Sequence, residues 1–396
     1  MNRKTLLSLI ALLLVSSSMF SQTFIQAYAD VVNQCSQSNI TNNLTEYEAL
    51  GVKRRGTVAL QNTLDWLKNK YLSYGYTVSQ MQEDSYTYQG STAACKNLIV
   101  TKIGTLYPNT YVIVDGHYDS ITGTGTNDNG SGVVTILEIA RLLQNVPTEY
   151  SIKFINFSGE EDGLFGSQHY VSSIVNGTNP KMSIRVVFNM DEIGGVAGMT
   201  NDTITCERDE NNNPSTNNAS SATKTNELIK CVGLYSPLKT QLSYAYSSDY
   251  MPFQANNEVI IGIFETNETS HKHTATDFLI YMDPTYVYNV AKASIGATMH
   301  FAIATPLLND EKSKTDYNVS FFPNPTKEEL NINLGSIAEN SYTFTLIDIN
   351  GKIVLSKTFS DPKLIESVSI STLAKGMYLA TLEAGDKKVT KKIVVE

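Results

Sequence analysis

Short apolar runs separated by polar and glycine-containing stretches recur from about residue 22 to residue 305. The runs that are rich in Val, Ile and Phe predict buried strands at residues 97–102, 111–115, 151–157, 184–190 and 259–264. Apolar residues at helical spacing predict helices at residues 57–74, 132–144 and 286–304. Alternation of strands with helices is typical of α/β proteins. We therefore expect a central, mostly parallel or mixed sheet that is flanked by helices.

One polar segment interrupts this alternation. Residues 209–226 are rich in Asn, Ser and Thr and contain almost no apolar side chains. Such a composition predicts an exposed loop, which here leads into a helix that carries Leu228 and Ile229.

The pattern changes again near residues 309–318, where charged and small polar residues gather without hydrophobic periodicity. Beyond this predicted linker, short alternating runs predict strands at residues 330–334, 343–348, 353–359, 378–383 and 389–395. Asn350-Gly351 lies between two of them and is a strong signal for a two-residue hairpin turn. We expect residues 22–308 to form an α/β domain and residues 319–396 a small all-β sandwich.

The first residues have the pattern of a secretory signal. Arg3 and Lys4 precede a short apolar segment at residues 6–15, and small residues follow up to Ser21. We predict that residues 1–21 are a signal peptide and that the mature protein is secreted. No later stretch is long enough to span a bilayer, so no stable membrane span is expected. Residues 22–55 are then either an inhibitory propeptide or part of the α/β domain.

Composition narrows the possible partners. The chain has 396 residues, 41% hydrophobic and 17% charged, which is ordinary for a globular protein with a sizeable core. A formal net charge of -9 argues against a general nucleic-acid-binding protein. The four cysteines allow one or two disulfides in an exported protein, and Cys206 with Cys231 is the first candidate pair. Because there is no CxxC spacing, a zinc site built from cysteine is not expected.

The chemistry of the chain gathers where the predicted strands end. His117 and Asp119 follow the second strand, Glu160 and Glu161 the third, and Asp191 the fourth. Carboxyl ends of strands in an α/β sheet form its ligand site, so these side chains should meet at one edge. Several carboxylates this close together raise one another's pKa unless a cation lies between them. The pattern therefore predicts a metal centre.

Two further residues complete the set. Asp128 lies in a glycine- and asparagine-rich loop that directly precedes a predicted helix. His273 follows the fifth strand. One histidine and one carboxylate for each ion, with a shared aspartate, would suit a pair of hydrolytic zinc ions.

The stretch from about residue 96 to residue 277 resembles the two-zinc aminopeptidases of the M28 peptidase type. The motifs that carry the resemblance are Gly116-His117-Tyr118-Asp119-Ser120, Asn127-Asp128-Asn129-Gly130-Ser131-Gly132, Gly159-Glu160-Glu161-Asp162-Gly163, Asn189-Met190-Asp191, Ser248-Asp249-Tyr250-Met251-Pro252-Phe253 and His273-Thr274-Ala275-Thr276-Asp277. They occur in the order that the family has. The resemblance implies the zinc exopeptidase fold and two Zn²⁺ ions in each subunit.

The resemblance also implies a role for each residue. His117 and Asp191 would bind one zinc ion, Glu161 and His273 the other, and Asp128 would bridge both. Glu160 would be the general base that takes a proton from water and passes it to the leaving amine. By the same likeness, Asp119 would orient the His117 ring and Asp277 would assist His273. The family often has His where this chain has Tyr250, so that position has no assigned role.

The other histidines are expected to be structural. His169 falls on a predicted helix segment beyond Glu161, and His300 lies in an apolar helix. His271 is two residues from His273, so in an extended segment its side chain would point the opposite way.

The C-terminal region resembles a second family. The segments Phe321-Phe322-Pro323-Asn324-Pro325, Ile347-Asp348-Ile349-Asn350-Gly351-Lys352 and Leu373-Ala374-Lys375-Gly376-Met377-Tyr378 look like the type A sorting domain of the type IX secretion system. The resemblance implies that this secretion machinery is a partner and that the protein is exported across the outer membrane. A carbohydrate-binding or purely structural sandwich is the alternative for this domain.

These expectations favour a secreted metallo-aminopeptidase that acts on peptides with a free N-terminus. A glutaminyl cyclase shares the α/β fold but uses a single zinc ion, and other zinc amidohydrolases, such as a carboxypeptidase or a deacylase, would use two. A non-catalytic binding module is the rival from another class. The full set of ligands together with Glu160 argues against it.

Overall fold

The computed structural model describes residues 22–87, 94–305, 319–334, 339–348, 352–385 and 387–396. The chain divides into two compact units at residues 307 and 308, and each is described by itself. The predicted signal peptide, the predicted linker and the Asn350-Gly351 turn lie outside the described residues. Among those that are described, no helix is both long and apolar enough to cross a lipid bilayer.

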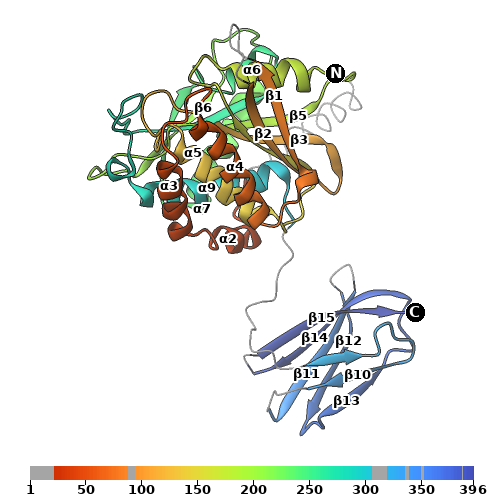
Figure 1. The fold of residues 1–396 in the computed structure, drawn as a ribbon. Helices are drawn as coiled ribbons and strands as arrows, with labels where there is room; N and C mark the ends of the chain where they lie inside the picture. The colour runs from red at the N-terminus through yellow and green to blue at the C-terminus, as the bar shows by residue number, and fades with distance from the viewer. Residues whose placement is uncertain (1–21, 88–93, 306–318, 335–338, 349–351, 386) are drawn as a thin grey trace, which may run out of the picture. The chain divides into compact units, whose positions relative to one another are not determined.

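The first unit is built on an eight-stranded mixed sheet with the order β1-β2-β4-β3-β5-β8-β6-β7 (Figure 1). Its strands are β1 (Met81–Thr87), β2 (Ala94–Lys102), β3 (Tyr107–His117), β4 (Tyr150–Phe157), β5 (Ser183–Met190), β6 (Thr203–Arg208), β7 (Lys239–Tyr244) and β8 (Ile260–Glu265). The four strands β4, β3, β5 and β8 at the centre run parallel to one another. Their carboxyl ends therefore lie at the same edge of the sheet.

Helices are interspersed with these strands along the chain. They are α2 (Gln26–Val32), α3 (Gln37–Ala49), α4 (Val58–Ser73), α5 (Gly130–Leu143), α6 (Phe165–Tyr170), α7 (Asn218–Tyr235), α8 (Met251–Ala255) and α9 (Pro284–Ala302), with short turns of 3₁₀ or π-helix at Val78–Gln80, Val171–Val175 and Leu279–Tyr281. Helix α9 packs against α2, α3, α5 and α7. The predicted α/β sheet with flanking helices is confirmed.

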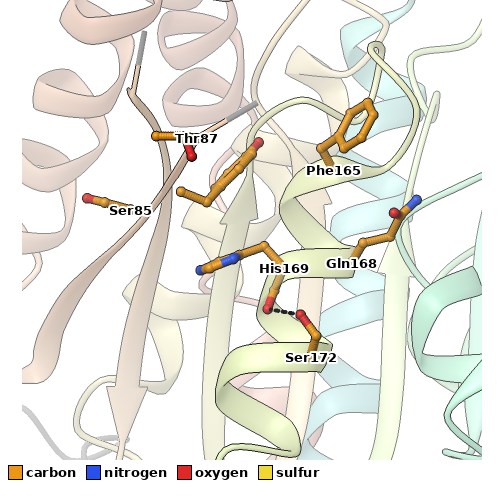
Figure 2. A pocket seen from close by; sticks show the side chains of 7 residues that line it. Ser85, Thr87, Phe165, Gln168, His169 and Ser172 are labelled. Atoms are coloured by element: carbon orange, nitrogen blue, oxygen red, sulfur yellow. Dashed lines mark hydrogen bonds between the residues drawn. The ribbon is translucent and has the colours of Figure 1, made fainter. Parts of the chain in front are cut away.

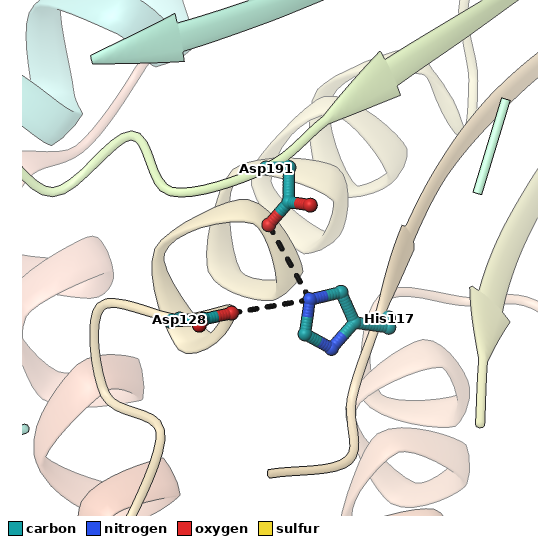
Figure 3. A group of neighbouring side chains, drawn as sticks. All are labelled: His117, Asp128 and Asp191. Carbon is teal, nitrogen blue, oxygen red and sulfur yellow. Dashed lines mark ion pairs between the residues drawn. The ribbon is translucent and has the colours of Figure 1, made fainter. Parts of the chain in front are cut away.

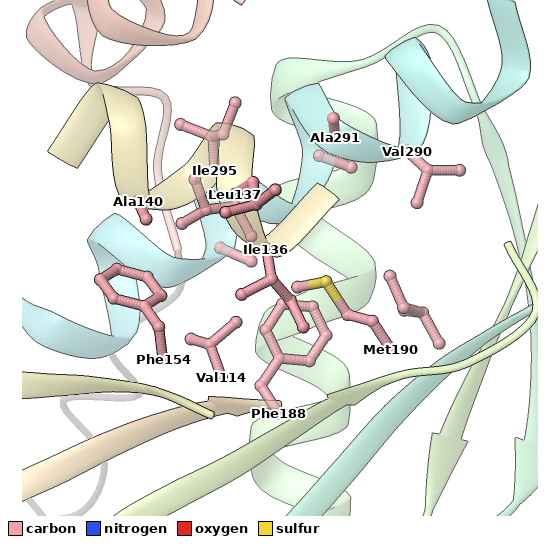
Figure 4. Packing of buried hydrophobic residues seen from close by; sticks show 14 of the residues in the cluster. Val114, Ile136, Leu137, Ala140, Phe154, Phe188, Met190, Val290, Ala291 and Ile295 are labelled. Atoms are coloured by element: carbon pink, nitrogen blue, oxygen red, sulfur yellow. The ribbon is translucent and has the colours of Figure 1, made fainter. Parts of the chain in front are cut away.

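The main core lies between the central strands and helices α5 and α9. Figure 4 shows Ile136 and Leu137 of α5 above Val114 and Phe188 of the sheet, with Ile295 of α9 beside them. All of these side chains are fully buried. Helix α5 is apolar on almost every side, as expected for a helix enclosed between a sheet and a second helix. Its first turn is capped by the Asn129 side chain, which accepts a hydrogen bond from the Gly132 N–H.

The five predicted strands and the three predicted helices are all present, with their ends shifted by a few residues. The polar segment is the main correction, because α7 begins at Asn218 and the predicted loop extends only to the preceding residue. Ser221 and Thr225 are buried because their hydroxyl groups donate to the carbonyls of Ile260 and Glu207. Polar side chains that bond to neighbouring backbone can line a buried helix face, which composition alone does not reveal.

Residues 22–55 form part of the first unit. Tyr28, Ile40 and Leu44 lie in the main core. The Tyr28 hydroxyl donates to the Ala304 carbonyl, and the Tyr47 hydroxyl donates to the Tyr118 carbonyl beside the predicted site. The segment thus packs as part of the first unit.

The predicted Cys206–Cys231 disulfide is wrong. All four cysteines are buried free thiols. Cys206 on β6 and Cys231 on α7 are fully buried in the main core, where they pack as small hydrophobic side chains. Burial raises the pKa of the Cys206 thiol to about 12, so it stays protonated and unreactive.

The second unit is an all-β sandwich. One sheet has the order β13-β10-β9 and the other the order β12-β11-β14-β15. Its strands are β9 (Ser320–Phe322), β10 (Glu329–Asn333), β11 (Ser341–Asp348), β12 (Ile353–Ser360), β13 (Ile365–Ser369), β14 (Gly376–Ala384) and β15 (Lys387–Val395). Alternating residues such as Leu330, Phe344 and Leu382 form its separate apolar core, as the period-two pattern predicts.

Candidate metal centre

The predicted ligands converge at the carboxyl edge of the parallel strands. His117 is the last residue of β3, Glu161 follows β4, and Asp191 follows β5. His273 lies in the loop after β8, and Asp128 directly precedes the cap of helix α5. The structure thus brings together residues that are far apart in the sequence.

The first group of three is His117, Asp128 and Asp191, which we call the buried trio (Figure 3). The His117 Nε2 atom lies 3.2 Å from Asp128 Oδ1 and 3.3 Å from Asp191 Oδ1. The three side chains come from a strand end and two separate loops and point toward one another. Only 1% of the His117 side chain is exposed.

The second group is Asp128, Glu161 and His273, which we call the open trio. The His273 Nε2 atom lies 3.0 Å from Asp128 Oδ2 and 3.0 Å from Glu161 Oε2. Asp128 therefore turns one oxygen to each histidine. The His273 side chain is 55% exposed, so this trio faces solvent.

The atoms of the buried trio fit a metal ion. His117 Nδ1 lies 3.2 Å from the Asp119 carbonyl oxygen and can donate its proton there. Nε2 then presents a lone pair to two carboxylate oxygens, and these groups repel unless a cation lies between them. Asp191 Oδ1 and Asp128 Oδ2 are also buried, and the polar atom that the structure places against each is a histidine Nε2. Histidine and carboxylate in this arrangement are ligands that zinc accepts.

The pKa shifts of the ligands also favour a cation at this site. Burial disfavours a charged His117 ring, yet the carboxylates of Asp191 and Asp128 raise its pKa well above the usual value. The hydrogen bond to Asp128 likewise raises the pKa of His273. The histidines in turn hold the pKa of Asp128 far below its usual range although burial opposes this. Both trios therefore favour a positive charge between their ligands.

Glu160 lies beside both trios but belongs to neither. Its backbone N–H donates to Asp119 Oδ1 over 3.3 Å. Burial, followed by the neighbouring carboxylates, raises the pKa of the Glu160 carboxyl well above its usual value. A carboxyl group of this kind can accept a proton near neutral pH and release it again.

Two carboxylates, Asp119 and Asp277, were expected to orient the two metal-binding histidines, and one of them has different partners. Asp119 lies behind His117, as predicted, with its backbone carbonyl nearest to Nδ1. The prediction that Asp277 assists His273 is wrong, because its two carboxylate oxygens each accept a backbone N–H over 3.0 Å, one from Asn127 and one from Asp128. Asp277 therefore fixes the loop that carries the shared ligand, a role that chain spacing could not distinguish.

The trios open into a cavity of about 360 Å³. Its lining includes residues that the sequence did not mark as ligands or as the base: Gly163, Leu164, Glu192, Glu207, Tyr246, Ser247, Ser248, Tyr250, Phe264 and Lys272. Tyr250, left without a role from the sequence, donates its hydroxyl to Glu207 Oε2 over 2.8 Å. Ser248 donates to Asp191 Oδ2 over 2.7 Å and so orients that carboxylate. Glu192 follows Asp191 directly, just beyond the end of β5.

The other histidines among the described residues lie outside both trios. His169 lines a separate groove between β1 and α6, with Ser85 and Thr87 on the opposite wall (Figure 2). Its ring lies 3.1 Å from Asp84 and belongs to neither trio. His300 accepts or donates a hydrogen bond with the Tyr235 hydroxyl, and His271 stacks on Tyr281.

Solved structures match the first unit. The LapA aminopeptidase of Legionella pneumophila aligns with a TM-score of 0.59 at 20% identity, over 73% of this chain and 78% of that one. A glutaminyl cyclase of Bacteroides thetaiotaomicron, solved with N-acetylhistamine, aligns with a TM-score of 0.54 at 17% identity, over 67% of this chain and 97% of that one. At these identities the likeness shows the fold alone.

Among curated proteins, Aminopeptidase YwaD of Bacillus subtilis is 44% identical over 84 residues, which are 21% of this chain and 18% of that protein. Leupeptin-inactivating enzyme 1 of Streptomyces exfoliatus is 32% identical over 144 residues, which are 35% of this chain and 31% of that protein. The matched segments thus span less than a third of either relative.

The mixed α/β sheet thus carries histidines and carboxylates at the carboxyl ends of its parallel strands. Residues 97–298 match Peptidase family M28. The chain belongs to this family. Residues 320–396 match the secretion system C-terminal sorting domain, as the sequence resemblance predicted.

Proposed function

We propose that the protein is a metallo-aminopeptidase that removes N-terminal residues from peptides with two zinc ions and a glutamate base. The observation that carries the proposal is Asp128, whose two oxygens face the histidines of two separate trios. Membership of Peptidase family M28 supports hydrolysis of peptides. The name of the Bacillus subtilis relative supports removal of N-terminal residues.

In the proposed reaction, different residues bind the metal ions, transfer the proton and position the ligands. His117 and Asp191 would hold one zinc ion, Glu161 and His273 the other, and Asp128 both. When bound, the two ions supply a lowered pKa for water and polarise the scissile carbonyl. Glu160 accepts the proton of the attacking water on its carboxylate and donates it to the departing amine. Ser248 and Asp119 keep Asp191 and His117 in position.

The chemistry of a glutaminyl cyclase is the second candidate, because one such enzyme shares the fold. That enzyme class would use a single zinc ion. The presence of two complete trios that share Asp128 favours two ions and hydrolysis. Measured zinc near one ion per chain would favour the cyclase.

We also propose that the protein is exported and released or held at the cell surface by the type IX secretion machinery. The match of residues 320–396 to a sorting domain supports this route. The signal-like residues 1–21 are consistent with a first export step.

The proposal is tested with a panel of chromogenic aminoacyl amides, each offered with a free and with an acetylated α-amine. We expect cleavage of the free amines alone, loss of cleavage with a chelator and recovery with zinc. Cleavage of the acetylated forms would instead identify an endopeptidase or a deacylase.

Glu160→Gln separates the base from the ligands. We expect turnover to fall by about 10²- to 10⁴-fold while two zinc ions stay bound. The zinc content is measured by atomic emission on the same sample. Normal turnover in this variant would remove Glu160 from the mechanism.

A further inference from the structure

We propose that the cavity beside the metal centre selects a basic N-terminal residue, lysine or arginine, through Glu192 and Glu207. The inference rests on the proposed aminopeptidase function and adds a substrate class to it. Both carboxylates line the cavity, and neither belongs to a trio. They are therefore acidic groups in addition to the ligands of the two trios.

Glu192 is the stronger observation. The residue lines the cavity although it is only 8% exposed. The Oε2 atom is buried without a hydrogen-bond partner. The Oε1 atom lies 3.4 Å from the Lys272 ammonium, which is itself in closer contact with Glu268. A buried carboxylate oxygen without a partner is costly, and a cationic substrate group would satisfy it.

Glu207 extends the acidic surface away from the ligands. It is 5% exposed, and Tyr250 holds its Oε2 atom. On the sheet it pairs with Gly262 of β8, which pairs in turn with Asn189 of β5. Glu207 thus lies two strand spacings, about 10 Å, from the strand that leads to Asp191. The α-amine of a substrate lies next to the reacting carbonyl, whereas the tip of a long side chain can cover such a distance.

Gly262 on the strand between them leaves room for Glu207 and Tyr250 to pack over β8. A Cβ atom at Gly262 would lie 2.7 Å from Glu207 Oε2 and 2.6 Å from the Tyr250 ring, so only glycine leaves space for this pair. Phe264, two residues further along the same face of β8, also lines the cavity with Leu164 and Tyr246. An aliphatic stem against these apolar side chains with a charged tip at the carboxylates matches the chemistry of lysine and arginine.

The test compares aminoacyl amides of lysine, norleucine and Nε-acetyl-lysine, which share the stem and the α-amine and differ at the tip. We expect kcat/KM for lysine to exceed that for norleucine by about tenfold or more, as for a hydrogen bond to a charged group. Arginine should follow lysine. Preference for norleucine, or for a glutamate amide that pairs with Lys272, would overturn the inference while leaving the aminopeptidase proposal intact. Absence of cleavage of every amide would instead contradict the proposed function.

Glu192→Gln and Glu207→Gln identify the responsible groups. Each should lower the lysine-to-norleucine ratio several-fold. An equal loss for both substrates would assign the carboxylate to the α-amine and contradict the proposal. Glu258→Gln is the matched control, since Glu258 is also buried but pairs with Lys181 and does not line the cavity. It should leave the ratio unchanged. Thermal melting of each variant separates loss of fold from loss of selectivity.

Discussion

The buried trio and the open trio share Asp128 but differ in how the protein supports their histidines. His117 ends a central strand, is 1% exposed and has the Asp119 carbonyl behind its ring. His273 lies in a loop, has a positive φ of 54° and exposes 55% of its side chain. The first site is held in shape by the sheet, whereas the second depends on a loop. If the proposed two ions are bound, we therefore expect the two sites to differ in affinity and in exchange rate.

Asp128→Asn should have the largest effect, because it weakens the ligand that both trios share. We expect zinc content to fall at both sites and hydrolysis to fall to the background of the chelated enzyme. Zinc content and activity of the same preparation check this. An Asp128→Asn protein that keeps two ions would show that the trios do not depend on a common ligand.

His117→Ala and His273→Ala test whether the buried trio and the open trio bind zinc with different strength. Loss of His273 should leave about one zinc ion per chain in the buried trio, because that trio is complete without it. Loss of His117 should weaken the site that the sheet supports and also leave its two carboxylates facing each other, so the folded state should melt at a lower temperature. Equilibrium dialysis against zinc and thermal melting measure both. Equal zinc loss and equal melting in the two variants would contradict the proposed difference.

Asp119→Asn tests the support behind the buried trio. The carboxylate accepts the Glu160 N–H and lies 3.7 Å from His117 Nδ1. We expect zinc affinity at the buried trio to fall about 10- to 100-fold, as for other groups that orient a metal-bound histidine. The affinity of the open trio should change less. Competition with a chelator of known affinity resolves the two sites.

The smallest expected effect is a pH dependence of the stabilisation that zinc gives to the folded protein. In the metal-free protein the carboxylates raise the pKa of His117, although burial opposes this, and Asp128 raises that of His273. A raised pKa adds stability below the unfolded histidine value of about 6.5, and this stability is lost as pH rises through the folded values. Zinc displaces those protons.

The gap in melting temperature between zinc-loaded and chelated protein should therefore widen as pH rises from 6 to 8.5. The comparison uses the same chain in both states, so other titrating groups largely cancel. A gap that stays constant or narrows would mean that the histidines do not carry these protons.

Much of the fold could be predicted because the central strands are contiguous apolar runs with few alternatives. The convergence of His117, Asp191 and Glu161 followed from a single rule, that parallel strands end at one edge. Strand β6 mixes polar and apolar residues, so its segment was not recognised and Glu207 had no visible place. The partners of Asp277 and the burial of α7 depend on hydrogen bonds between distant segments. Those bonds have no local sequence pattern.

The contact between the two ends of the first unit bears on how the chain folds after synthesis. Helix α2 packs on α9, and the hydroxyl of Tyr28 reaches the carbonyl of Ala304. During synthesis the apolar face of α2 therefore stays exposed until the partner of Tyr28, 276 residues further along the chain, has been made. Such long-range closure slows folding and lengthens the time in which the chain remains unfolded. It also places the ends of this domain close enough for circular permutation, with a new start at an exposed turn.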